Sequence, residues 1–197
     1  MKTPFRFQAS KYDCVPTSIL NAVSALFSRD EIPPIVIEKI YSYSLDNIID
    51  NNMCQGTTEE AIRMLGNWLT NYKEGTFSVR SEYCTGDKVH LQPKSKILKT
   101  LKEGGVALLF VCMKNGYWHY VLAVNCEGDF INCFDPYLLT KISNEEDLEF
   151  IEQETVQIQS PNLKIHINRL DSESKRKQYA FGRMKDRTCL LLSRDNS

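Results

Sequence analysis

Residues 8–20 have the sequence QASKYDCVPTSIL, which predicts an amphipathic helix with a cysteine at its start. Apolar residues recur at the spacing of one buried helix face, and the opposite stripe is polar. The apolar positions are Ile19, Ala22, Val23, Leu26 and Phe27, and the polar positions are Thr17, Asn21, Ser24 and Ser28. Pro16 fits only the first turn of a helix, because proline has no N–H to donate. Asp13 is a candidate N-cap, and Cys14 is expected in the first turn or at the cap.

The position of Cys14 gives it a possible chemical role. The start of a helix carries a partial positive charge, which favours a thiolate over a thiol, and a thiolate is a candidate nucleophile. Two facts oppose this interpretation. Most free cysteines are small buried residues that react with nothing, and a neighbouring carboxylate such as Asp13 disfavours the thiolate. A catalytic interpretation therefore requires a base and an orienting group from elsewhere in the chain.

Composition excludes several classes of function. The chain has 197 residues, is 42% hydrophobic and 25% charged, and carries a net charge of -1, which is typical of a single soluble domain. This charge gives no basis for binding nucleic acid or a membrane surface. No stretch approaches the ~20 apolar residues of a membrane span. Because no apolar run suited to a secretory signal follows Met1, we expect a cytoplasmic protein.

The cysteines do not suggest disulfides or a metal site. Seven cysteines are scattered along the chain without a C-x-x-C pair, and only three histidines accompany them. Such spacing argues against a disulfide framework and against zinc, so we expect neither a metal ion nor a cofactor. Cys112, Cys126 and Cys133 lie in or beside apolar strand-like runs and are expected in the core.

The order of elements predicts an α+β fold. Helices are expected at residues 14–27, 35–43, 57–71 and 95–103. Strands are expected at residues 76–83, 106–113, 118–125, 130–134, 156–159, 164–170 and 188–192. The acidic segment 145–154 is compatible with a short helix, and residues 171–178 are expected to be solvated. We therefore expect one domain over residues 1–197, with a helical lobe over about 1–75 and a mainly antiparallel sheet over about 76–197.

A histidine and an aspartate are brought together by one predicted hairpin. His119 opens one strand and Asp135 follows the next. A two-residue turn at Glu127-Gly128 would place Asp135 opposite Tyr120 and His119 opposite Pro136, and a bulge would change this by one or two residues. In such a pair, the aspartate fixes the histidine tautomer and leaves the other ring nitrogen for a thiol. Each residue alone has a plainer interpretation, a core histidine and a turn.

Gln8 is a fourth candidate residue for a reaction at Cys14. A tetrahedral intermediate at Cys14 needs two hydrogen-bond donors directed at its oxyanion. The backbone N–H of Cys14 is one, and the side-chain amide of Gln8, arriving from the preceding loop, is a candidate for the other. Without this context, a glutamine near a chain start would be interpreted as a solvated residue.

These motifs resemble those of papain-like cysteine peptidases, and most closely the bacteriocin-leader peptidases and their stand-alone relatives. The similarity covers roughly residues 5–137 and is carried by Gln8, DCVPTS (13–18), GYWHYVL (116–122) and FDPY (134–137). The resemblance implies a papain-like fold with Cys14 as nucleophile, His119 as general base, Asp135 as orienting residue and Gln8 as oxyanion donor. Val15 departs from the glycine common in this group, and the chain lacks the membrane spans of its transporter-linked members.

We therefore expect a cytoplasmic cysteine peptidase that needs no cofactor. It would hydrolyse a peptide or isopeptide bond of a peptide or protein substrate through an acyl-enzyme at Cys14. Two alternatives remain open. The same Cys-His-Asp site could pass the acyl group to an amine or thiol, as in a transglutaminase-like acyltransferase. Alternatively, the chain could be a catalytically silent module that binds peptides. No motif is identified within residues 138–197.

Overall fold

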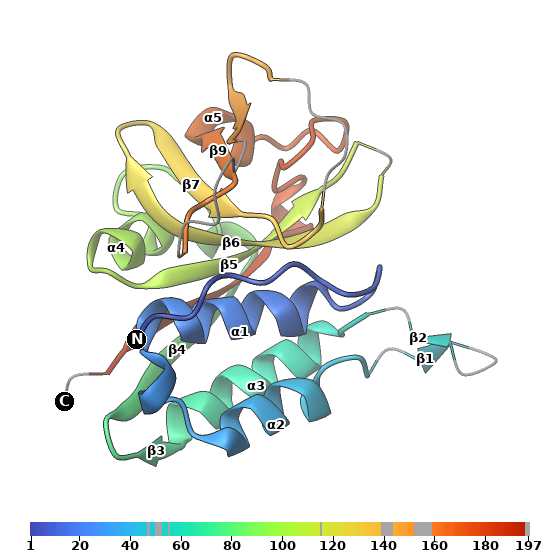
Figure 1. Ribbon diagram of the computed structural model, residues 1–197. Coiled ribbons are helices and arrows are strands. Elements are labelled where there is room, and N and C mark those ends of the chain that lie inside the picture. Colours follow the sequence, from blue (N-terminus) through green and yellow to red (C-terminus); the bar gives the residue numbers. More distant parts are fainter. Residues whose placement is uncertain are drawn as a thin grey trace.

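The protein is built around an antiparallel sheet with helices on both faces (Figure 1). The computed structural model describes residues 1–46, 48–49, 53–54, 56–114, 116–138, 144–151 and 159–195. Within these ranges, eight strands pair in the order β3-β4-β10-β5-β6-β7-β9-β8. Their bounds are β3 (Lys73–Glu74), β4 (Phe77–Thr85), β5 (Val106–Cys112), β6 (Trp118–Glu127), β7 (Phe130–Phe134), β8 (Leu148–Phe150), β9 (Leu163–His166) and β10 (Thr188–Arg194). The expected α+β class is confirmed.

The first three helices lie together on one face of the sheet (Figure 1). They are α1 (Cys14–Leu26), α2 (Pro34–Tyr43) and α3 (Glu59–Asn71), and the short hairpin of β1 (Ile48–Ile49) and β2 (Met53–Cys54) follows α2. The opposite face carries α4 (Lys96–Lys102), and α5 (Ile167–Leu170) follows β9. Short 3-10 turns are η1 (Arg29–Glu31), η2 (Gly86–Lys88) and η3 (Met184–Asp186). Within the described ranges, no helix has the length and apolar character needed to cross a membrane.

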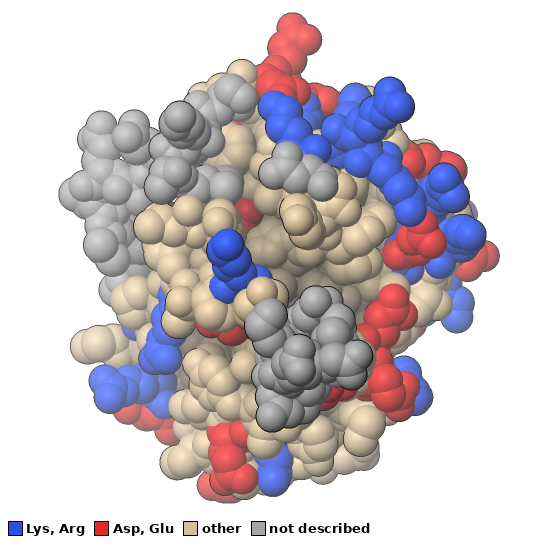
Figure 2. Space-filling view, turned by 90° about the vertical axis from the view of Figure 1, so that its right-hand side faces the viewer, with Lys and Arg blue, Asp and Glu red and all other residues tan. Residues whose placement is uncertain are grey.

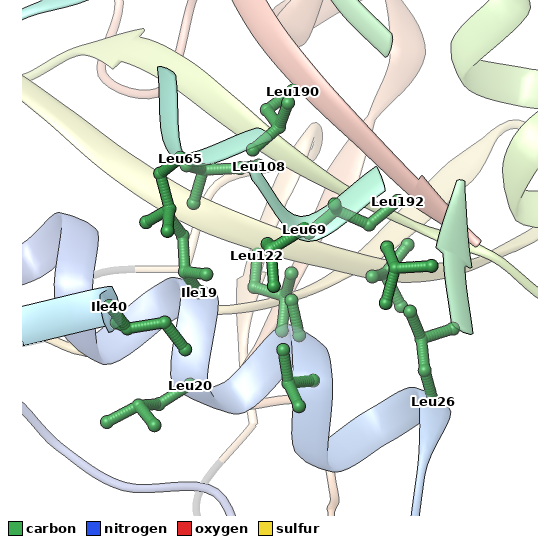
Figure 3. Packing of buried hydrophobic residues seen from close by; sticks show 14 of the residues in the cluster. Ile19, Leu20, Leu26, Ile40, Leu65, Leu69, Leu108, Leu122, Leu190 and Leu192 are labelled. Carbon is green, nitrogen blue, oxygen red and sulfur yellow. The ribbon is translucent and has the colours of Figure 1, made fainter. Parts of the chain in front are cut away.

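Alternation along the central strands divides the buried apolar residues into two cores. On the helical face, Leu108, Leu122 and Leu190 meet the inner side of α1 and α3 (Figure 3). Leu109 and Val121 point the other way, into a core shared with α4. Because successive strand residues face opposite sides, the three apolar strands β5, β6 and β10 each supply residues to both cores. The sheet is thereby held in one place relative to the start of α1.

Most expected elements begin and end within two or three residues of their predicted bounds, with three differences. Segment 145–154 contains β8 instead of a helix. Segment 164–170 divides into β9 and α5, because the His166 side chain accepts a hydrogen bond from Asn168 N–H and starts a helical turn. Cys126 is partly exposed, unlike Cys112 and Cys133, and it lies next to the turn of the β6–β7 hairpin. Most of the strand expected at 156–159, and the side chain of Cys54, lie outside the described residues.

One residue on the polar stripe of α1 is buried under an N-terminal strap, which we define as residues 3–9. Asn21, only 1% exposed, accepts a hydrogen bond from Arg6 N–H and donates one to Arg6 O, both at 2.9 Å. Phe5 and Phe7 pack on Phe134 at the end of β7, with ring centroids 5.1 and 5.2 Å away. The strap therefore joins α1 to the sheet along the side where α1 begins.

Candidate active site

Cys14 is the first residue of α1, and its side chain is partly exposed. The first amide of the helix with a backbone acceptor is that of Thr17, which donates to Asp13 O at 3.1 Å. Pro16 has no N–H. Among the hydrogen bonds of the described residues, none uses the Cys14 backbone N–H. Because the first turn of a helix leaves its N–H groups without internal partners, this amide is available to a ligand beside the sulfur.

Asp13 occupies the N-cap position, but within the described residues its carboxylate accepts from no backbone N–H of the helix, and its one helix partner is the Thr17 hydroxyl at 3.3 Å. It accepts hydrogen bonds from Ala9 N–H at 2.8 Å, Ser10 N–H at 2.7 Å and Ser10 Oγ–H at 2.6 Å. Burial alone would raise the pKa of Asp13, but the hydrogen bonds from Ser10 and Ala9 lower it below its usual value. The ionised carboxylate thus folds residues 9–13 into a tight loop that leads into Cys14.

His119 and Asp135 form a buried pair on the sheet side of the site. His119 lies near the start of β6, Asp135 follows β7, and His119 Nε2 is 2.7 Å from Asp135 Oδ1. Burial disfavours the imidazolium, but the charge and hydrogen bond of Asp135, together with a hydrogen bond to Cys14, outweigh it and raise the pKa of His119 to about 10. Since Asp135 occupies Nε2, Nδ1 is the nitrogen left for the thiol. The predicted residues Cys14, His119 and Asp135 therefore meet in one site.

The turn that joins the two strands differs from the prediction. Glu127 pairs with Phe130, which leaves Gly128-Asp129 as the two-residue turn in place of Glu127-Gly128. Gly128 has a φ of 58°. A tight hairpin requires this left-handed conformation at its first turn residue, and glycine adopts it without a steric penalty.

A bulge then sets the register near the site. The pairing changes by one residue across Val124, and beyond the bulge the register places Asp135 opposite Val121, not opposite Tyr120 as expected. Val121 and His119 lie on the same face of β6 because they are two residues apart. His119 and Asp135 are therefore diagonal neighbours on adjacent strands, a separation that these side chains span.

Gln8 reaches the site through the N-terminal strap. Its backbone N–H donates to Pro136 O at 2.8 Å, which fastens the strap directly beside Asp135. Its side-chain Nε2 donates to Ser10 O at 2.6 Å, and Oε1 is buried without a hydrogen-bond partner among the described residues. An amide nitrogen has two hydrogens, and the bond to Ser10 O uses one of them.

Two residues of the site were not predicted from the sequence. Asn162 brackets Asp135, accepting from Asp135 N–H at 2.8 Å and donating to Asp135 O at 2.9 Å. The hydroxyl of Tyr179 donates to Asp135 Oδ2 at 2.7 Å. Both come from the part of the chain without recognisable motifs. The only sequence signal was the apolar triplet Tyr179–Phe181, which directly follows a charged segment.

Exposed aromatic residues flank each member of the candidate site. Tyr12, Tyr117 and Tyr137 each lie two residues from Cys14, His119 or Asp135, and all three are at least 41% exposed. The Tyr137 ring meets the His119 ring edge-on, with centroids 6.4 Å apart. Figure 2 shows the side of the molecule where α1 begins, with a central hollow whose described border is mostly tan and includes a basic and an acidic side chain. Exposed aromatic rings are thus close in sequence to Cys14, His119 and Asp135.

Within the described ranges, no group of three His, Cys, Asp or Glu side chains is arranged to hold a metal ion. A scan against models of known protein families and a search of curated proteins found no match to this chain. The chemistry of the site is therefore argued from its own residues.

Proposed function

We propose that the protein is a cysteine hydrolase that cleaves a peptide or isopeptide bond through an acyl-enzyme at Cys14. The observation that carries this proposal is that His119 pairs with the buried carboxylate of Asp135 at 2.7 Å and lies close enough to Cys14 for that thiol to raise the pKa of His119. The resemblance of these residues to papain-like peptidases, in particular bacteriocin-leader peptidases, supports the same assignment of roles. The layout of helices followed by an antiparallel sheet is compatible with a papain-like fold.

The proposed reaction proceeds in two halves, with His119 carrying the proton. Cys14 gives its proton to His119, and the thiolate forms a C–S bond to the substrate carbonyl carbon. The imidazolium then protonates the leaving amine as the C–N bond breaks, which leaves a thioester on Cys14. Water attacks this thioester while His119 takes its proton, and the C–S bond breaks to release a carboxylic acid and the thiol. Asp135 holds the ring in the required tautomer throughout.

Two donors stabilise the oxyanion in this scheme. One is the unpaired backbone N–H of Cys14, and the other is the second N–H of the Gln8 amide. Donors fixed in place before the reaction are effective because they need no reorganisation when charge develops. Gln8 is held in this way, since both its backbone and its side chain are hydrogen-bonded.

The proposed compartment is a reducing one, in keeping with a cytoplasmic protein. The six cysteines among the described residues are all unpaired, including the directly opposed Cys84 and Cys189 of neighbouring strands. Disulfides form readily in oxidising compartments when two cysteines face each other in this way. The proposed partner is accordingly a peptide or protein substrate in the same compartment.

The proposal is tested by competitive alkylation of the thiols. With limiting iodoacetamide at pH 6 to 7, mass spectrometry should find Cys14 modified first, because His119 supplies the counter-charge for a thiolate. Cys126 is the matched control, since it too is partly exposed but lies away from the histidine. His119→Ala should remove the preference for Cys14. Equal labelling of Cys14 and Cys126 in the unmodified protein would contradict the assignment of the nucleophile.

A peptide electrophile separates the proposed hydrolase from its alternatives. A peptidyl aldehyde or vinyl sulfone library should modify Cys14, and the matching peptide amides should be cleaved to acids and amines. Transfer of the acyl group to an added amine in preference to water would favour the acyltransferase. Peptide binding without modification of Cys14 would favour the silent module.

A further inference from the structure

Tyr179 has a backbone conformation that tyrosine rarely adopts. Its φ is 65°, in the left-handed region, which bulky side chains avoid because their Cβ crowds the backbone. Hydrogen bonds hold it there. Tyr179 N–H donates to Cys112 O at 2.7 Å, and Cys112 N–H donates to Ala180 O at 2.8 Å. Such strained residues gather at functional sites, so the direction of the Tyr179 side chain calls for a functional explanation.

That side chain is aimed at the carboxylate of the proposed site. Asp135 Oδ1 accepts from His119 Nε2 at 2.7 Å and from Tyr137 N–H at 2.8 Å, and Oδ2 accepts from the Tyr179 hydroxyl at 2.7 Å. Tyr179 is fully buried. Burial, and then the charge and hydrogen bond of Asp135, raise the pKa of Tyr179 well above its usual value. The hydroxyl therefore stays protonated and can only donate to the carboxylate.

The segment that carries Tyr179 is anchored by a buried arginine. Arg187, 1% exposed, donates to Gly182 O at 2.9 Å, to Val89 O at 2.9 Å and to Asp171 at 2.6 and 2.7 Å. These bonds close residues 171–187 into a loop fixed at both ends. The loop thus gives the Tyr179 hydroxyl a defined position relative to β5 and Asp135.

We infer that Tyr179 is a positioning residue that acts on His119 through Asp135. Its hydroxyl fixes the carboxylate with Oδ1 toward His119 and weakens the attraction of that carboxylate for the imidazolium proton, because each added donor makes a carboxylate less basic. The inference rests on the proposed function, in which His119 exchanges a proton with Cys14. It gives a role in the site to a residue outside the recognised motifs.

Two opposite changes at position 179 test this coupling. Tyr179→Phe keeps the ring and removes the donor, so Asp135 should bind the His119 proton more strongly. By NMR of the full chain, the proton between them should move to lower field, and the midpoint of the His119 titration should rise by up to about one pH unit. Replacing Tyr179 with 3-fluorotyrosine makes the hydroxyl a stronger donor, and both signals should move in the opposite direction.

Phe181→Leu is the matched control. Phe181 is fully buried in the same segment, and no hydrogen bond among those of the described residues joins it to Asp135. This variant should lower the melting temperature and leave the His119 signals in place. If Tyr179→Phe behaves in the same way, Tyr179 has only a structural role and the inference is overturned.

The coupling between Tyr179 and His119 can still be tested if one variant does not fold, or if the proposed hydrolase activity is refuted. Should Tyr179→Phe not fold, the fluorotyrosine protein, which retains the hydroxyl and nearly the same volume, decides alone: unmoved His119 signals would overturn the inference. The NMR measurements require no turnover. A Cys14 that fails to react with electrophiles would therefore refute the proposed hydrolase, and the coupling of Tyr179 to His119 would still be measured.

Discussion

Asp135→Asn isolates the charge that holds the proton on His119. The two side chains are nearly the same size, and an amide oxygen can replace Oδ1 opposite His119 and Tyr137. The NH₂ group of the asparagine takes the place of Oδ2. It cannot accept a hydrogen bond, so the Tyr179 hydroxyl loses its acceptor. The main loss is the negative charge beside a buried imidazolium.

The structure sets the size of the expected effect. The pKa of His119 is about 10 against a usual value of 6.5, a difference that corresponds to about 5 kcal/mol at about 1.4 kcal/mol per tenfold change. Asp135 contributes more to the rise in the pKa of His119 than Cys14 does, and burial of the ring opposes the rise. With the charge removed, burial dominates, so the His119 titration midpoint should fall below about 7. At neutral pH, the ring would then be mostly neutral.

NMR titration of the imidazole protons measures this change. The chain has only three histidines, so His90→Gln and His166→Gln assign the His119 signal. Asp147→Asn is the control, because it removes a carboxylate that pairs with Arg169 instead of a histidine. Alkylation of Cys14 at pH 6 should slow by about tenfold or more in Asp135→Asn only. A His119 midpoint that stays near 10 in this variant would refute the argument that Asp135 holds the proton.

Three further outcomes are expected. Gln8→Ala should lower kcat by about 10²–10³ on a cleavable peptide with little change in KM, and should leave the alkylation of Cys14 intact. In Cys14→Ser protein, the folded state keeps the His119 proton to well above pH 6.5, whereas the unfolded state loses it near pH 6.5. The free energy of unfolding should therefore fall as the pH rises above 6.5. Denaturant titrations at several pH values, with and without His119→Gln, measure this fall. Arg187→Met should cost about 3–5 kcal/mol of unfolding free energy, against less than about 0.5 for the exposed Arg183→Met.

Local patterns predicted the elements that depend on local chemistry. Pro16 and the apolar spacing after Ile19 fixed the start and buried face of α1, because a proline and a 3.6-residue period leave few alternatives. The candidate residues Cys14, His119 and Asp135 followed from their positions at element ends, and Gln8 followed from its place in the loop before Cys14. The prediction that His119 pairs with Asp135 was correct although the predicted turn was wrong. The actual turn and the bulge change the register in opposite directions, so the observed register differs from the predicted one by only one residue.

Long-range contacts were beyond local patterns. Tyr179 and Asn162 contact Asp135 across 44 and 27 residues of chain, and neither lies in a periodic segment. The burial of Asn21 under the strap was equally hidden, because an asparagine on a polar helix stripe is expected to face solvent. Side chains that form hydrogen bonds with buried backbone groups meet their partners only in the folded structure. A short sequence window therefore cannot identify them.

The bulge at Val124 makes the spacing between His119 and Asp135 sensitive to chain length. Side chains alternate between the faces of a strand, so deleting one residue within β7, after the turn and before Asp135, would turn the carboxylate toward the helical face. Extra residues at Gly128-Asp129 would only lengthen a loop at the far end of the hairpin, where the pairing of both strands is already fixed. Insertions at the turn of this hairpin should therefore be tolerated, whereas deletions in the strand before Asp135 should inactivate the protein, although neither replaces a residue of the site.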